Sequence, residues 1–267
     1  MAESDEPTPS KRSRFLRRSA LILLVAVFLL SLYNIATLSL MKKHNNSPDR
    51  DPETGIIVGA EPITIGPESA DTAILFVHGF VGARDNFWEV PHQLADKGYR
   101  VRLMLHAGHG TTPQEFDDTP TSDLLDHVVE EIHALQENHD KVILVGHSMG
   151  GALSTIAAST EDIDGLVLAA PYFGVTHQWY YVLPVEFWSS LTNHFIHRVY
   201  KGDAFIRVKR PEAKSQIMSY RWIPAKGATS LIRIGNQAKN ADTLKSITAP
   251  VLHIHGKDDF AASPEAA

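Results

Sequence analysis

The segment Gly146–Gly150, which reads Gly-His-Ser-Met-Gly, carries the residues best suited to chemistry in this chain. The preceding run, Lys141–Val145, is largely apolar and rich in β-branched residues, which predicts a buried strand. The small residues of 151–158 predict a helix after it. A sharp, glycine-flanked turn between them would present Ser148 as a nucleophile at a helix N-terminus, where the helix dipole favours negative charge. The alternative is a turn that only links strand to helix.

Two further glycine motifs follow predicted strands. His78–Gly82 reads His-Gly-Phe-Val-Gly and comes directly after the apolar run 72–77, and Gly-His-Gly at 108–110 follows the predicted strand 99–105. With the serine motif, their order and spacing resemble the α/β-hydrolase superfamily, and within it the carboxylesterases and monoacylglycerol lipases. The resemblance covers about residues 60–262. It implies an α/β fold, a mostly parallel sheet covered by helices, and acyl transfer at Ser148.

The resemblance also implies which groups would assist the serine. The backbone N–H groups of Phe80 and Met149 would form the oxyanion hole. The family order places a carboxylate after a later strand, here predicted within 249–256, and Asp259 stands three residues after its closing glycine. Asp258 is the second choice. For both carboxylates the alternative is an ordinary solvated turn, where aspartate is common.

The general base of a catalytic triad is missing from the sequence. The resemblance places this histidine after one further strand beyond the acid, whereas the last histidine here is His255 and the sequence stops at Ala267. We therefore expect a C-terminal truncation of a longer protein, with a hydrolase-like protein that has lost its chemistry as the alternative. If the chain were active as it stands, His78 or His109 would be the first candidates for the base.

The N-terminal region predicts a single-pass membrane anchor. Residues 19–41 carry no charge, and a helix of that length is about 34 Å long against a hydrocarbon core of about 30 Å. Five basic residues precede it closely, and only Lys42 and Lys43 follow at once. The positive-inside rule therefore puts the basic tail 1–18 in the cytoplasm and the hydrolase domain on the non-cytoplasmic side, which in a bacterium is the periplasm or the extracellular space. A cleaved signal peptide is the alternative, but no convincing cleavage site is present.

The remaining sequence predicts one α/β domain behind a polar linker at 42–54. The core is expected at 55–170, with strands at 56–58, 63–65, 72–77, 99–105, 141–145 and 165–170 and helices at 86–97 and 122–138. A helical lid insertion without a clear strand is expected at 171–240, and the chain returns to the core at 241–267 with the acid-bearing strand.

Twelve aromatic residues fall within the expected insertion. An aromatic lid over the serine would form an apolar acyl pocket and exclude water, so Trp179 and Trp188 are expected to bind substrate. The alternative is that these aromatic residues only form the small core of the insertion itself.

Neither a cofactor nor a metal is expected. The histidine pairs 253/255 and 106/109 lack a third ligand at a sensible spacing, and the chain has no cysteine to supply a thiolate. Residues 51–267 carry a net charge of −10, which argues against nucleic acid as a partner.

The sequence thus predicts a membrane-anchored serine hydrolase that cleaves lipid-like or monoacylglycerol-type carboxylic esters through an acyl-enzyme. An amidase or peptidase of the same fold is one alternative. A non-catalytic, hydrolase-like domain that binds a lipid or a protein is the other. The oligomeric state is left open.

Overall fold

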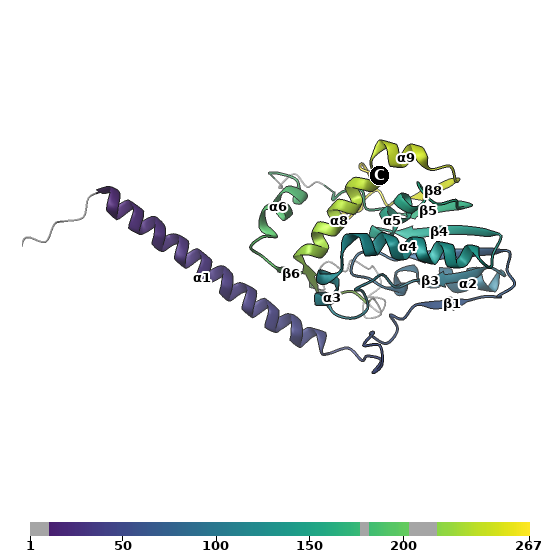
Figure 1. The fold of residues 1–267 in the computed structure, drawn as a ribbon, viewed down its shortest axis with the longest axis horizontal. Helices are drawn as coiled ribbons and strands as arrows, with labels where there is room; N and C mark the ends of the chain where they lie inside the picture. The colour runs from purple at the N-terminus through teal and green to yellow at the C-terminus, as the bar shows by residue number, and fades with distance from the viewer. Residues whose placement is uncertain (1–10, 177–181, 203–217) are drawn as a thin grey trace, which may run out of the picture.

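The computed structural model describes residues 11–176, 182–202 and 218–267, and Figure 1 shows a sheet flanked by helices with one long helix projecting from it. The sheet has six strands in the order β1-β3-β2-β4-β5-β8. They are β1 (Ile63–Ile65), β2 (Thr72–Val77), β3 (Arg100–Leu103), β4 (Lys141–His147), β5 (Gly165–Ala169) and β8 (Val251–Ile254). Neighbouring strands are parallel except β1 and β3. The mostly parallel sheet predicted from the sequence is therefore confirmed.

Helices cover both faces of this sheet. The helices described are α1 (Lys11–Asn45), which projects from the domain, the 3₁₀ turn η1 (Arg84–Phe87), α2 (Val90–Asp96), α3 (Pro113–Asp118), α4 (Thr121–Gln136), α5 (Met149–Ala157), α6 (Val185–Thr192), α8 (Ala225–Ala238) and α9 (Ala241–Ser246). The predicted helix at 122–138 corresponds to α4, whose buried residues repeat every three or four positions.

Alternate side chains of the central strand β2 enter two separate cores, because neighbours on a strand point to opposite faces. Leu75 and Val77 belong to the larger core, which contains buried residues of α4, α5 and α8. Phe76 faces the other way and packs with Phe87 and Leu94, beside η1 and α2. The sheet is therefore buried on both sides, as expected for parallel strands that read as continuous apolar runs.

Two predicted elements of the core differ from the structure. The helix expected at 86–97 is divided, because Trp88 adopts a left-handed φ of 51° between η1 and α2. The prediction of a strand at 56–58 is wrong, since Ile57 makes only an isolated β-bridge to Arg50. Three adjacent β-branched residues satisfied the strand pattern there, but no neighbouring strand is available for pairing.

The expected lid insertion contains a hairpin that sequence analysis missed. Strands β6 (Arg198–Tyr200) and β7 (Trp222–Pro224) pair antiparallel, so the expectation of no strand in this region is wrong. Three residues are too few to show an alternating pattern. In addition, α8 lies within the expected insertion but places Ile234 in the larger core against α5, so the chain returns to the core before residue 241.

Helix α1 is longer than the expected span at 19–41. It continues through Lys42 and Lys43 to Asn45, because no helix-breaking residue occurs before Pro48. Among the residues described, it is the one helix long and apolar enough to cross a membrane. Its N-terminal half projects away from the domain in Figure 1.

A test of this packing is the substitution Gly150→Ala. A Cβ at Gly150 would overlap the carbonyl group of Val77 and lie 2.5 Å from that of His78, so α5 would have to move away from β2. We expect the free energy of unfolding to fall by about 3 kcal/mol or more, measured by urea denaturation in a mild detergent. The control is Gly165→Ala, whose Cβ would lie 3.6 Å from the Ile143 side chain. Equal stability of the two variants would contradict a close contact between α5 and β2.

Candidate active site

Ser148 stands at the turn between β4 and α5 in a strained backbone conformation. Its φ of 53° and ψ of −117° are rarely adopted by a residue with a Cβ. The backbone N–H of Ser148 donates to the carbonyl of Ala169 at 3.1 Å, and its own carbonyl accepts from the N–H of Tyr172 at 2.9 Å. These bonds tie the turn to β5 and the segment after it. The partly exposed side chain is thereby held at the N-terminus of a helix.

The glycines around Ser148 are required by close backbone approach. A Cβ at Gly146 would lie 2.6 Å from both the carbonyl oxygen of Gly150 and the Cα of Gly151. Real Cβ atoms do not approach backbone so closely, and a larger residue at Gly146 would push the helix off the strand. The Gly-x-Ser-x-Gly spacing therefore reflects the contact between β4 and the first turn of α5.

The loop after β2 passes directly beside this turn. A Cβ at Gly79 would lie 3.2 Å from the Cβ of Ser148. The next backbone N–H, that of Phe80, has no acceptor among the described residues. The N–H of Met149 belongs to the first turn of α5, where no acceptor exists within the helix. Two backbone donors thus flank the serine, an arrangement that can stabilise a developing oxyanion.

Three buried histidines brace this loop. The N–H of His106 donates to Nε2 of His78 at 3.1 Å, and Nε2 of His106 donates to the carbonyl of His78 at 3.0 Å. Nε2 of His109 accepts from the N–H of Val81 at 3.2 Å, while its Nδ1 donates to the carbonyl of Ala107 at 3.1 Å. The ends of β2 and β3 are joined by these bonds.

The bracing histidines are neutral in the folded protein. Burial lowers the pKa of His78 and His106 well below the usual value and lowers the pKa of His109 to about 3. Nδ1 of His78 donates to the carbonyl of Gly79, so both ring nitrogens of His78 and of His109 are already bonded to backbone groups. Neither ring can take a proton from Ser148, and His109 has no nitrogen left for a metal.

Two polar residues of η1 fix the loop from its other side. The side-chain oxygen of Asn86 accepts from the N–H of Gly79 at 3.0 Å, and Asp85 accepts from the N–H of Met218, within the expected insertion, at 2.7 Å. Burial raises the pKa of Asp85 to about 6. Sequence analysis gave neither residue a role. The available signal was a pair of polar residues placed directly after a glycine loop.

The two candidate acids differ in their surroundings. One oxygen of Asp259 accepts from the N–H groups of Ala261 and Ala262 at 2.8 and 3.1 Å, and the other lies 3.6 Å from Nε2 of His255. Asp258 is exposed. A carboxylate held by backbone donors has a fixed orientation, so Asp259 is the better placed of the two.

The field of Asp259 reaches the serine turn. Burial lowers the pKa of His147, and the negative charge of Asp259 opposes that effect. His147 directly precedes Ser148, and because β8 pairs parallel with β5 and β5 with β4, the segment that carries Asp259 follows β8 at the same edge of the sheet as this turn. Among the described histidines, none is hydrogen-bonded to the Ser148 hydroxyl. His255 bonds instead to the carbonyl of Ala262 at 3.2 Å.

Of the two expected substrate-binding tryptophans, the structure describes Trp188, and no described contact joins it to this site. Trp179 lies outside the described residues. Trp188 is 43% exposed on α6, and its ring contacts that of Phe187 with centroids 5.6 Å apart.

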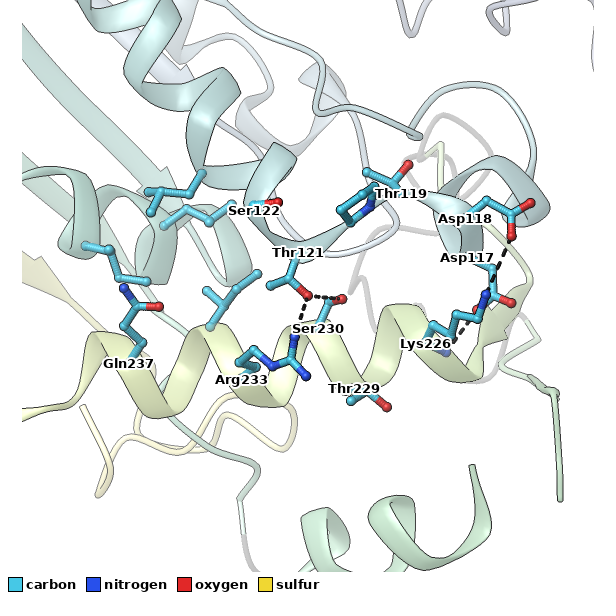
Figure 2. A pocket seen from close by; sticks show the side chains of 15 residues that line it. Asp117, Asp118, Thr119, Thr121, Ser122, Lys226, Thr229, Ser230, Arg233 and Gln237 are labelled. Atoms are coloured by element: carbon cyan, nitrogen blue, oxygen red, sulfur yellow. Dashed lines mark hydrogen bonds and ion pairs between the residues drawn. The ribbon is translucent and has the colours of Figure 1, made fainter. Parts of the chain in front are cut away.

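A separate cleft of about 600 Å³ lies between the start of α4 and α8 (Figure 2). Its lining is mixed, and its polar part is hydrogen-bonded: the Thr121 and Ser230 hydroxyls are 2.8 Å apart, and Arg233 reaches Thr121 at 3.5 Å. Leu153 of α5 also lines it. Neither Ser148 nor the loop after β2 contributes to its lining, so this cleft is distinct from the serine site.

Comparisons with known proteins agree with this geometry. The family described as "Serine aminopeptidase, S33" matches residues 68–267. The "Thermostable monoacylglycerol lipase" of Bacillus sp. (strain H-257) is 32% identical over 113 residues, which are 42% of this chain and 44% of that protein. The "Bifunctional esterase/perhydrolase DCH" of Acinetobacter calcoaceticus is 28% identical over 216 residues, 73% of this chain and 76% of that protein.

The fold is also found among solved structures. One chain, from work on the metagenome-derived lipolytic enzymes LipS and LipT, superimposes with a TM-score of 0.68 at 25% identity and covers 79% of this chain and 81% of its own length. By contrast, the match to the Bacillus lipase spans less than half of that protein's length, at 44%.

The buried carboxyl group predicts a pH effect on stability. The pKa of Asp85 is about 6 in the folded chain against an ordinary value of 3.8, so the folded state holds its proton more tightly and loses stability as pH rises from 3.8 to about 6. Asp85→Asn keeps an acceptor for Met218 and cannot ionise. We expect it to be more stable than the parent at pH 7.5 by about 1–2 kcal/mol, with the difference vanishing near pH 4.

Urea denaturation of both proteins across this pH range measures the effect. Asp258→Asn, at an exposed carboxylate, is the control and should follow the parent at every pH. If the Asp85→Asn variant were no more stable than the parent at pH 7.5, ionisation of Asp85 would not destabilise the folded state.

Proposed function

We propose, from the premise that this chain belongs to the serine aminopeptidase S33 family of α/β-hydrolases, that it is a serine hydrolase of carboxylic esters. The observation that carries the proposal is the strained turn at Ser148 with a backbone N–H donor on each side. That arrangement suits attack on an acyl carbon, because the negative charge that develops on the carbonyl oxygen meets donors already in place.

In the proposed reaction, the Ser148 hydroxyl attacks the ester carbonyl and the N–H groups of Phe80 and Met149 hold the oxyanion. The hydroxyl proton passes to the imidazole of a histidine, a group that the described residues do not place beside Ser148, and from it to the leaving alcohol. This leaves an acyl-enzyme that water then hydrolyses. We assign to Asp259 the orientation of that imidazole. Its carboxylate is fixed by two backbone donors and follows β8, at the sheet edge where β4 ends at the serine turn.

We propose lipid-like esters, of the monoacylglycerol type, as substrates. A monoacylglycerol lipase and lipolytic enzymes are among the similar proteins, and the insertion after β5 is rich in aromatic residues. Trp179 and Trp188 are the tryptophans we assign to the acyl chain. Trp188 is exposed on α6, where an apolar chain can reach it.

We also propose that α1 anchors the protein in a membrane, with the basic tail 1–18 in the cytoplasm and the hydrolase domain on the other side. The support is the length and apolar character of the segment 14–45, together with the basic residues that precede its uncharged part. A signal sequence that is later removed would have the same apolar character.

The second candidate function is a peptidase, which the description of the matched family favours. The same serine, oxyanion hole and acid can cleave an amide, so the turn at Ser148 does not separate the two. A comparison of kcat/KM for p-nitrophenyl esters with kcat/KM for aminoacyl p-nitroanilides distinguishes the esterase from the peptidase. A clear preference for the anilides would replace the esterase proposal with the peptidase.

Serine and acid variants of the full-length protein test the mechanism. Ser148→Ala should abolish labelling by a fluorophosphonate, and Asp259→Asn should lower kcat by about 10³–10⁴-fold, because an amide cannot stabilise the imidazolium. The controls are Ser154→Ala, at a buried serine of α5, and Asp258→Asn, and both should stay close to the parent. Labelling that survives Ser148→Ala would exclude this serine as the nucleophile, and no labelling of the parent would favour a binding domain.

The acyl-chain profile tests the substrate class. With p-nitrophenyl esters of increasing length, we expect kcat/KM to be higher for medium and long chains than for acetate, because each buried methylene contributes about 0.8 kcal/mol to binding. Steady-state kinetics below the critical micelle concentration of each ester provide the measurement. A flat or inverted profile would exclude a lipid-like acyl group.

A further inference from the structure

The domain-side end of α1 is fixed to the insertion. The hydroxyl of Tyr33 donates to the carbonyl of Arg198 at 3.2 Å. The side-chain amide of Asn34 donates to the carbonyl of Phe195 at 2.8 Å and accepts from the N–H of His197 at 3.1 Å. The segment that leads into β6 is therefore hydrogen-bonded to the helix at both positions.

The same contact continues along one face of α1. The Arg198 side chain is buried, and its guanidinium donates to the carbonyl of Asn34 at 2.8 Å and lies 3.5 Å from the hydroxyl of Thr37. Further along the helix, the indole N–H of Trp222 donates to His44 at 3.1 Å. These α1 positions recur at helical spacing, so β6 and β7 pack along a single stripe of the helix.

The part of α1 that is free of these contacts is shorter than a membrane is thick. Between Arg18 and Tyr33 lie 14 uncharged residues, which form about 21 Å of helix against a hydrocarbon core of about 30 Å. The uncharged stretch continues to residue 41, and its last part, from Tyr33 onward, is hydrogen-bonded to the insertion. A bilayer that covers the whole apolar stretch therefore also surrounds the parts of the insertion beside it.

The surface of the insertion suits such a position. Within 182–200, the only residues with a formal charge are Glu186 and Arg198. Glu186 accepts from the N–H of Val175 at 2.9 Å, and Arg198 is buried against α1. Four exposed side chains of α6 and the turn after it are large and apolar, namely Phe187, Trp188, Leu191 and Phe195, and the exposed polar residues among them, Ser190 and His194, carry no formal charge.

The orientation of α6 is set from its other side. Asn193 donates from its side chain to the carbonyl of Ala225 and to the hydroxyl of Thr229, both on α8. The polar side of α6 thus faces the domain and its apolar side faces outward. Figure 1 shows α6 between α8 and the free half of α1, on the side of the domain from which α1 projects.

We propose that the part of the insertion at 182–200 is seated in the nearer leaflet of the bilayer beside its own anchor, with the apolar side of α6 among the lipid acyl chains. The contact between Asn34 and Arg198 sets the depth of α6. This inference rests on the membrane anchoring proposed above, and its partner is a phospholipid leaflet. The exposed aromatic residues of α6 then occupy the interfacial depth that tryptophan favours.

Depth-dependent fluorescence quenching tests the proposal. Because the chain has no cysteine, single cysteines can carry a bimane label at Leu191, at Val25 in the free part of α1, or at Val90, an exposed residue of α2 remote from α1 in Figure 1. The full chain is reconstituted into phosphatidylcholine–phosphatidylglycerol vesicles that contain nitroxide lipids. A nitroxide near the headgroup should quench the Leu191→Cys label, a nitroxide near the chain end should quench the Val25→Cys label, and neither should quench at Val90.

The outcomes separate this proposal from the anchoring on which it rests. Quenching at Val25 without quenching at Leu191 would overturn the seating of α6 while leaving the anchor intact. No quenching at either position would overturn the anchor, and the seating with it.

A second variant tests the contact that sets the depth. In the Leu191→Cys background, Asn34→Ala should lower headgroup-region quenching by roughly twofold or more, while the Val25→Cys label is unaffected. Ser31→Ala is the control, because the Ser31 hydroxyl bonds only within its own helix, to the carbonyl of Val27 at 2.8 Å. Unchanged quenching in Asn34→Ala, with unfolding temperature also unchanged, would show that this contact does not set the depth.

Discussion

The close approach of α5 to the end of β2 is the contact on which the candidate site depends. Gly150 lies so near the carbonyl groups of Val77 and His78 that no side chain fits between them. Through this contact, the turn after β4 and the loop after β2 meet at one edge of the sheet. The strained conformation of Ser148 persists because β5 and the segment after it bond to the same turn.

The loop after β2 is held mainly by neutral, buried polar groups. His78, His106 and His109 use ring nitrogens to satisfy backbone groups that would otherwise be buried without partners. His78 and His109 accept backbone N–H bonds through Nε2, which a protonated imidazole could not do, so the low pKa values that burial gives these two rings match the bracing role. Histidines near a serine are therefore not evidence of a base when their nitrogens are already bonded.

Much of the core could be predicted from the sequence because its strands are continuous apolar runs and its turns carry glycines at fixed spacing. The region around Ser148 has both signals. The hairpin of β6 and β7 has neither, since each strand is three residues long and the two are far apart in sequence. The contact of Asn34 with Arg198 joins residues 164 positions apart, and no local pattern reveals such a pair. The role of Asp85 likewise depends on Met218, which only the fold brings near.

Helix α1 is unbroken from Lys11 to Asn45, and this continuity has a mechanical consequence. A straight helix tilts when its apolar length exceeds the thickness of the surrounding bilayer. Since the far end of α1 is bonded to β6 and β7, a tilt of the anchor would act as a lever and rotate the insertion relative to the lipid surface. In the anchored state that we propose, the thickness of the host membrane would then influence how the insertion is oriented relative to the sheet.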